Sequence, residues 1–221
     1  MINRLRREMA AAANPDKARG MQAYMKSTMP YHGINLPEVR AISKRVFDGS
    51  EMTCAEWRAT ILELWRDARR REERYAALFL LRARQHRACL VPEVMPMLEE
   101  MIVTGAWWDY VDDVAGVIGD LLRTHPRRMK PLMRKWSTDP NLWKRRVSII
   151  CQLKFKGETD LELLYGNIAP NLNDKDFFIR KAIGWALRQY AWTDPEEVAR
   201  YVRANESRLS GLSKREALKN L

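Results

Sequence analysis

Arg71 to His86, with the sequence REERYAALFLLRARQH, decides the fold class, because its apolar residues recur at the spacing of one helical face. The same period is present from Trp107 to Leu122, from Asn141 to Phe155 and from Asp176 to Tyr190. No stretch alternates apolar and polar residues between turns, as a half-buried strand does. The sequence therefore predicts an all-α protein.

Short breaks separate the helical stretches wherever Pro, Gly, Asn and Asp gather. They lie at Asn14-Pro15, Gly33 to Pro37, His125-Pro126, Asp139-Pro140, Asn171 to Asp174 and Asp194-Pro195. The residues seven places after the turn residue before each long helix are Arg74, Asp112, Arg146 and Lys181, with separations of 38, 34 and 35 residues. This period predicts a curved superhelical solenoid of HEAT-like helix pairs. No long linker divides the chain, so we expect residues 1–221 to form a single domain.

Residues in matching register form a row on the concave side of such a solenoid. Three members of this row are cations, as a groove that follows phosphates requires, and the fourth is Asp112. An alternative stays open at this point. The row can be solvated surface charge, or Asp112 can form an ion pair with Arg146 of the next repeat.

The formal net charge of +11 favours a polyanionic partner, either nucleic acid or an anionic membrane surface. No apolar run approaches the ~20 residues of a membrane helix. The N-terminal stretch MINRLRREMAAAANPDK lacks the features of a signal peptide. We therefore expect a cytoplasmic protein with no membrane association, and a monomer, because no dimer seam is evident.

Cysteine and histidine usage argues against a metal site. The three cysteines are Cys54, Cys89 and Cys151, which are far apart in the sequence and not in C-x-x-C pairs. We expect neither a disulfide framework nor a zinc site from this spacing. Nucleotide-binding glycine motifs and the serine-hydrolase motif are missing as well. The sequence therefore predicts no metal and no organic cofactor.

Thr104 to Asp113, TGAWWDYVDD, opens a helix and carries the candidate chemistry. Asp109 falls in the first turn, where the helix dipole favours a carboxylate, so we expect a structural role for it. Trp108 and Asp112 are four residues apart and share a face, whereas Trp107 points toward the neighbouring helix. A carboxylate on a basic face repels phosphate, so Asp112 is expected to meet a positive group.

Cleavage of a glycosidic bond supplies such a group. Its transition state resembles an oxocarbenium ion, which a nearby carboxylate stabilises. A purine alkylated at N3 or N7 is cationic and leaves readily, so one carboxylate suffices. Tryptophan faces also attract cations, by about 0.5–2 kcal/mol.

Two later segments add cations and aromatic rings. In Asn141 to Lys156, the candidate phosphate ligands are Arg145, Arg146 and Lys154, and Trp143 is expected to pack between repeats. In Phe178 to Tyr190, Trp185 lies four places after Lys181, and Gly184 leaves room for a close backbone approach. Core packing is the plain alternative for Trp185.

Seven segments together resemble the DNA alkylation repair enzymes of the AlkD type, bacterial alkylpurine glycosylases built of HEAT-like repeats. They are Ala23 to Ser27, Gly33 to Arg40, Glu63 to Trp65, Trp107 to Asp113, Leu142 to Lys156, Phe177 to Ala191 and Leu212 to Lys219. The combination of WWDYVD with RKAIGWALRQYA is specific, and the resemblance runs almost from end to end.

The resemblance implies a role for each matched residue. The catalytic aspartate falls on Asp112, the two sugar-contacting tryptophans on Trp108 and Trp185, and the arginine that holds the lesion strand on Arg146. Further matches place Tyr24 near the lesion and Lys154 and Arg188 along the DNA groove. Enzymes of this type do not flip the target base into a pocket.

These observations predict a glycosylase that releases N3- or N7-alkylated purines from double-stranded DNA. Asp112 would stabilise the sugar cation, and the cations, with Lys181 and Arg145 among them, would bind phosphates. Two other readings stay open. One is a non-catalytic HEAT-like module that binds damaged or branched DNA, and the other is a scaffold for an acidic protein partner.

Overall fold

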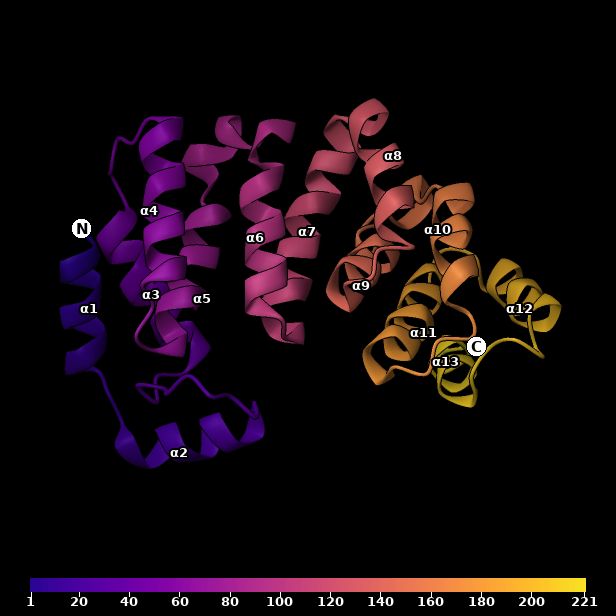
Figure 1. Ribbon diagram of the computed structural model, residues 1–221, viewed down its shortest axis with the longest axis horizontal. Coiled ribbons are helices and arrows are strands. Elements are labelled where there is room, and N and C mark those ends of the chain that lie inside the picture. The colour runs from indigo at the N-terminus through magenta and orange to yellow at the C-terminus, as the bar shows by residue number, and fades with distance from the viewer. The chain divides into compact units, whose positions relative to one another are not determined.

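The computed structural model describes all 221 residues and contains thirteen α-helices, four short 3-10 helices and no strand (Figure 1). The prediction of an all-α protein is confirmed. None of the helices combines the length and apolar character needed to cross a membrane. The chain separates into two compact units, Met1–Leu90 and Val91–Leu221, each described here by itself. The expectation of a single domain stays a prediction.

The first unit is built from helices that pack around large buried side chains. Its helices are α1 (Ile2–Ala11), α2 (Pro15–Tyr24), α3 (Leu36–Phe47), α4 (Cys54–Arg66), α5 (Arg71–Leu81) and the 3-10 helix η1 (Arg84–Cys89). α5 packs against both α3 and α4, and α1 packs against α3. Trp57 and Trp65 of α4 are fully buried, and the indole N–H of Trp57 donates to the carbonyl of Leu80. The apolar faces of the four helices thus form the core of this unit.

A buried carboxylate fixes the loop that precedes α3. Glu72 accepts hydrogen bonds from the backbone N–H groups of His32, Gly33 and Ile34, at 2.9 to 3.2 Å. Gly33 has a φ of 87°, and a Cβ there would lie 2.0 Å from the carbonyl oxygen of Asn14. Only glycine fits this position, and the three charge-assisted hydrogen bonds hold the loop on α5.

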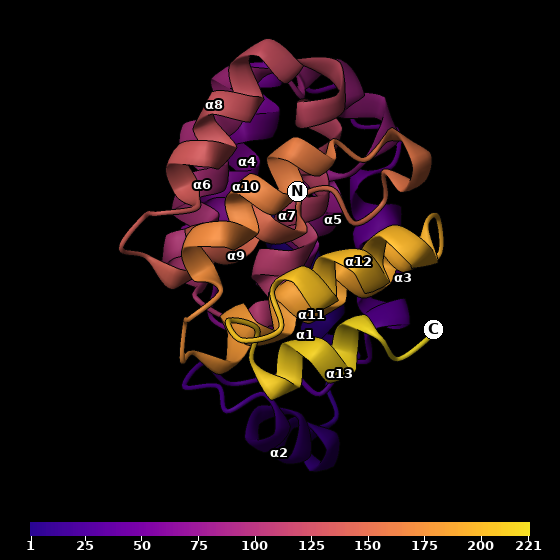
Figure 2. The same ribbon diagram turned by 90° about the vertical axis from the view of Figure 1, so that its right-hand side faces the viewer.

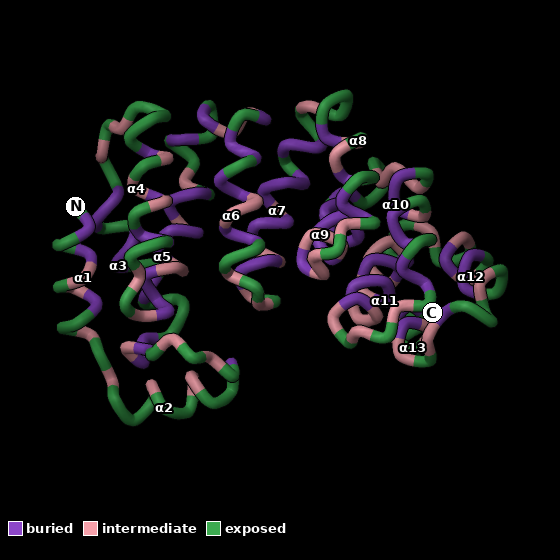
Figure 3. Tube along the Cα trace, viewed as in Figure 1, coloured by how far each residue is buried: buried purple, intermediate pink, exposed green.

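Helix α2 stands apart from this core, since none of its residues is buried (Figure 3). Its start is fixed by Asn14, whose side chain accepts from the backbone N–H of Lys17. α2 is therefore stabilised by its cap and by the proline at its first position rather than by burial.

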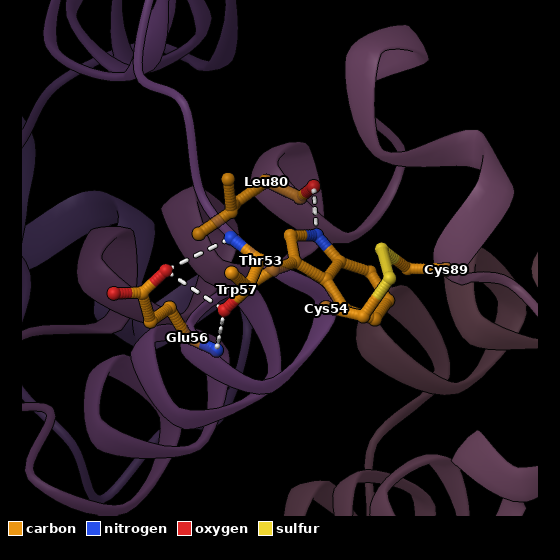
Figure 4. The surroundings of a disulfide bond; sticks show 6 residues. All are labelled: Thr53, Cys54, Glu56, Trp57, Leu80 and Cys89. Carbon is orange, nitrogen blue, oxygen red and sulfur yellow. Dashed lines mark hydrogen bonds between the residues drawn. A yellow bond between two sulfur atoms is a disulfide. The ribbon is translucent and has the colours of Figure 1, made fainter.

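A disulfide joins Cys54, the first residue of α4, to Cys89, the last residue of η1 (Figure 4). The expectation that the cysteines form no disulfide is wrong for this pair. The two residues are 35 positions apart, about one helical repeat, so the fold brings their Cα atoms to 5.3 Å although their sequence spacing gives no hint of it. Cys151 is buried and free.

We expect the double substitution Cys54→Ser/Cys89→Ser to lower the free energy of unfolding by about 3 kcal/mol, because the crosslink closes a long loop in the unfolded chain. Urea unfolding of the variant and of the oxidised protein, followed by circular dichroism, measures the difference. Alkylation of the denatured, unreduced protein should modify Cys151 alone. Modification of all three cysteines would show that the thiols are not joined.

The second unit contains a row of helices in which each contacts the next. Its elements are η2 (Pro92–Val94), α6 (Met95–Gly105), α7 (Trp108–Thr124), α8 (Pro126–Trp136), α9 (Leu142–Ile150), η3 (Lys156–Glu158), α10 (Leu161–Ile168), η4 (Ala169–Asn171), α11 (Phe177–Ala191), α12 (Pro195–Ala204) and α13 (Gly211–Ala217). α7 packs on α9, α9 on α11 and α11 on α13, while α6, α8, α10 and α12 flank this row (Figure 1). Contacts between successive helix pairs are the packing of a helical repeat solenoid, as the period predicted.

The predicted breaks coincide with helix boundaries. Asn141 and Asp176 cap α9 and α11 by accepting hydrogen bonds from backbone N–H groups. Two helices are shorter than the periodicity suggested, since α5 ends at Leu81 and α9 at Ile150. Beyond these ends, His86 and Phe155 are still buried although their segments are not α-helical. The apolar pattern therefore continues past the last residue of each helix.

Gly184 permits close packing of α11 on α13, as Figure 2 shows for the helices themselves. A Cβ at this position would lie 2.5 Å from Cβ of Glu216 and 2.9 Å from the carbonyl oxygen of Ser213. The Ser213 hydroxyl in turn donates to the carbonyl of Arg180. The close approach expected at Gly184 is therefore found, and it fixes α13 beside the helix that carries Trp185.

Candidate active site

The start of α7 places the residues with predicted chemistry. Trp107 is the N-cap, Trp108 is the first helical residue and Asp109 lies in the first turn, as expected. Asp112 follows one turn after Trp108, so the two side chains leave the same face of the helix. Trp108 is 37% exposed, which leaves its ring accessible to a ligand.

Three aromatic rings pack the starts of α7, α9 and α11 together. The ring centroid of Trp107 lies 6.4 Å from that of Trp143 and 5.4 Å from that of Phe178, and the last two are 4.9 Å apart. The packing expected for Trp107 and Trp143 is found. Because such pairs add about 0.5–1.5 kcal/mol each beyond burial, they fix the three helices that present the site.

Asp112 and Arg146 form a two-pronged ion pair between α7 and α9. Nε of Arg146 donates to Oδ1 of Asp112 at 2.7 Å, and Nη2 donates to Oδ2 at 2.8 Å. Nη1 donates to the carbonyl of Phe178 at 2.7 Å, which links the pair to the start of α11. The side chains are 6% and 17% exposed, respectively, for Arg146 and Asp112. The ion-pair alternative raised by their register is therefore realised.

Burial raises the pKa of the Asp112 carboxyl above its ordinary value, and the nearby Asp109 raises it further. The hydrogen bonds and charge of Arg146 act against this rise. Since desolvation is the largest effect, the carboxylate is held ionised chiefly by one guanidinium in a place that disfavours its charge. A group that becomes positive beside Asp112 would relieve that cost.

A pocket of about 210 Å³ opens beside this pair. Its lining includes Asp112 and Asp113 of α7, Lys154 after α9, and Trp185 and Gln189 of α11. The Trp185 ring centroid lies 6.0 Å from Cζ of Arg146. The second unit thus brings Asp112, Arg146, Trp185 and Lys154 to one place.

Most of the predicted phosphate ligands have a carboxylate partner. Glu216 of α13 bridges Lys181 at 2.9 Å and Arg188 at 2.6 Å. These cations, Lys181 first, lower the pKa of the Glu216 carboxyl. Arg145 lies 3.1 Å from a carboxylate oxygen of Asp174. Each of the three cations is therefore partly neutralised by an acid, which weakens its attraction for a phosphate.

Lys154 differs, since it is exposed, lines the pocket and has no ion-pair partner. It is the strongest candidate in this unit for a direct phosphate contact. Two other predicted residues belong to the first unit: Tyr24 ends α2 and is 78% exposed, and Arg74 stacks its guanidinium over Trp65 at 4.7 Å. Their roles toward DNA stay predictions.

Sequence reasoning overlooked several pocket residues. Gly116 and Gly119 form part of the wall, and a Cβ at Gly119 would lie 2.3 Å from the carbonyl oxygen of Cys151. Two glycines inside a helix were an available signal, because each costs about 1 kcal/mol and needs a packing reason. No group of three His, Cys, Asp or Glu side chains lies close enough to hold a metal ion.

Comparison with known proteins identifies the same family that the sequence motifs resemble. The model of the DNA alkylation repair enzyme family matches residues 5–221. A solved structure of a predicted DNA alkylation repair enzyme from Enterococcus faecalis is 32% identical, with a TM-score of 0.81, over 95% of this chain and 96% of that one. The crystal structure of smu.31 from Streptococcus mutans UA159 is 15% identical, with a TM-score of 0.61, over 84% of this chain and 92% of that one, and shares the fold alone. No curated protein matches this chain.

Proposed function

Because the chain belongs to the DNA alkylation repair enzyme family, we propose that it is a monofunctional glycosylase for N3- or N7-alkylated purines in duplex DNA. Membership of the family, which the motifs predicted, supports a role in DNA repair and an enzymatic activity. The observation that carries the finer proposal is the buried Asp112 carboxylate at the edge of a pocket that Trp185 also lines. We further propose a cytoplasmic monomer that needs neither a metal nor an organic cofactor.

The reaction breaks the bond between C1′ of the sugar and the purine nitrogen. Both bonding electrons go to the purine, which leaves as a neutral base because it carried a positive charge. The sugar becomes cationic, and Asp112 stabilises that charge. Each Asp112 oxygen accepts one N–H from Arg146 and keeps a lone pair for a water molecule. That water adds to C1′ through its oxygen and releases one proton to the surrounding solvent, which leaves a neutral abasic sugar.

Trp108 and Trp185 would contact the sugar of the lesion nucleotide, and Lys154 would bind a neighbouring phosphate. Three of the five N–H groups of Arg146 donate to Asp112 and Phe178, so Nη1 and Nη2 each keep one N–H for a phosphate, on a side chain that is only 6% exposed. We propose that the base is not flipped into the pocket. In support, the Phe155 ring that lines this pocket is buried and has the Arg123 guanidinium 4.3 Å from its centroid, so it presents no open face on which a flipped base would stack.

A second candidate is a module that binds damaged or branched DNA without catalysis. The Asp112–Arg146 pair favours it in one respect, because each group satisfies the other without any ligand. In that case Asp112 serves only to hold Arg146 between α7 and α9. The two candidates differ in whether a base is ever released.

Incubation with duplex DNA that carries 7-methylguanine or 3-methyladenine, in the presence of a chelator, tests the proposal. We expect free methylated base and an equal amount of abasic site. DNA that is bound but releases neither base would overturn the glycosylase and favour the second candidate.

The rate of base release should depend on pH through Asp112. The carboxylate is active when ionised, so activity persists above its pKa and is lost as the pH falls through it. Because burial raises that pKa, the loss should occur at higher pH than for an ordinary aspartate, whose pKa is about 3.9. Single-turnover rates against pH, corrected for spontaneous depurination, give the midpoint. A midpoint at or below the ordinary value would contradict the assignment.

A further inference from the structure

The first unit contains a larger hollow than the one beside Asp112, about 500 Å³ against about 210 Å³. It lies between the end of α3 and the segment that leaves α5. The residues around it are Arg40, Ser43, Lys44, Phe47, Asp48, Phe79, Leu80, Arg82, Ala83, Arg84 and Gln85. We refer to this hollow as the α3–α5 groove.

The α3–α5 groove is strongly basic. Four of its lining side chains are cations and one, Asp48, is a carboxylate. The guanidinium of Arg40 has an aromatic partner rather than an acid, since its Cζ lies 5.0 Å from the centroid of Phe79. Lys44 and Arg84 are exposed and form no ion pair. Arg40, Lys44 and Arg84 therefore face one hollow, and none of them forms an ion pair, although Asp48 lines the same hollow.

The neighbouring surface of the same unit is different. On the α1 side of α3, Glu8 binds Arg4 at 2.9 Å and Arg45 at 3.0 Å. Arg45 and Lys44 are adjacent on α3, yet only the one that points away from the groove has an acid. On α3 itself, therefore, the cation that faces the groove is uncompensated and the cation that faces α1 is paired.

The groove is also preformed. Its floor is apolar, with Phe47 and Leu80 buried. The side-chain amide of Gln85 donates to the carbonyl of Phe47 at 3.0 Å and so ties the start of η1 to the end of α3. The Cys54–Cys89 disulfide holds the other end of η1. Arg84 is therefore carried on a segment that is anchored at both ends.

We propose that the α3–α5 groove is a second DNA contact, which binds the sugar–phosphate backbone of the duplex. Arg40, Lys44 and Arg84 would bind backbone phosphates, and the Phe79 ring would hold the Arg40 guanidinium in place. The inference rests on DNA being the substrate, but not on base release at Asp112. When protein cations bind phosphates, they release the counterions that are condensed on the DNA. This release supplies most of the affinity for undamaged duplex DNA.

Salt-dependent binding tests this inference on undamaged duplex DNA, so that no catalysis is involved. The variant is Arg40→Gln/Lys44→Gln/Arg84→Gln, measured by fluorescence anisotropy from low to moderate salt. The matched control, Arg4→Gln/Arg7→Gln/Arg45→Gln, removes the same charge from the α1 side of the same unit. The slope of log K against log salt should become shallower by about 2 to 3 in the groove variant and by less than 1 in the control.

Equal slopes for the two triple variants would overturn the inference. A second result would also overturn it: inorganic phosphate at millimolar concentration or a free mononucleotide binds the groove, while the groove variant keeps the wild-type salt slope for duplex DNA. The groove would then be a site for a small anion. The outcome is separable from the glycosylase proposal. If no base is released, the glycosylase proposal fails but the salt slopes still test the groove. If the slopes are equal, the groove inference fails but base release still tests the glycosylase proposal. Equal urea midpoints for the two variants exclude unfolding as the cause.

Discussion

Asp112→Asn should reduce the rate of 7-methylguanine release by about 10²–10³-fold while DNA binding persists. The factor is that expected for loss of one preorganised group that stabilises developing charge. The amide is similar in size and can still accept one hydrogen bond from Arg146, so we expect the fold to persist, with a loss of stability because the buried guanidinium loses its counter-charge. Binding should be unchanged or slightly tighter, because a negative charge has been removed from a surface that meets phosphates. Single-turnover release and anisotropy titration measure the two effects separately.

The matched control is Asp113→Asn, which removes a carboxylate from the next residue of the same pocket. Its loss of activity should be at least about ten times smaller, since only Asp112 is assigned to the sugar cation. Release at the wild-type rate by Asp112→Asn would remove the residue from the mechanism. Equal losses in the two variants would point to the net charge of the pocket rather than to one carboxylate.

Arg146→Met should destabilise the protein by about 3 kcal/mol at pH 8. Removing one partner of a buried ion pair leaves the other charge without compensation, and the partial exposure of Asp112 places the cost at the low end of the known range. Without Arg146, the pKa of Asp112 rises further, because the effect that lowers it is gone. When folding raises the pKa of a carboxyl, the free energy of unfolding of the protein falls as the pH increases through that pKa. The deficit should therefore be smaller at pH 5 than at pH 8.

Urea unfolding at the two pH values measures this deficit. Arg134→Met is the control, since it breaks an exposed pair with Glu162 and should leave the midpoint unchanged at both. Arg146→Met with the midpoint of the wild type at pH 8 would show that the pair does not support the packing of α7 on α9.

The sequence predicted the helices well because a 3.6-residue apolar period and capping residues are local signals. Asn141 and Asp176 cap the helices that their positions indicated. The register of Asp112 and Arg146, 34 residues apart, also predicted their meeting as one of two alternatives. In a regular repeat, residues one period apart occupy equivalent positions on neighbouring helices. The sequence could therefore predict this contact.

Contacts that depend on the path of irregular segments were out of reach. Cys54 and Cys89 pair because η1 turns back toward α4, and no local pattern encodes that turn. Glu216 neutralises Lys181 and Arg188 from α13, a short helix whose placement depends on Gly184. For this reason the sequence assigned to DNA two cations that already share an acid.

A duplex that mimics the charged transition state gives the most direct test of the role of Asp112. One strand would carry a cationic pyrrolidine in place of the lesion sugar, and a second duplex a neutral tetrahydrofuran at the same site. An enzyme complementary to a sugar cation should bind the first at least ten times more tightly, since about 1.4 kcal/mol of differential stabilisation suffices. The preference should disappear in Asp112→Asn. Equal affinity for the two duplexes, or a preference that survives the substitution, would contradict the assignment of Asp112 as the counter-charge.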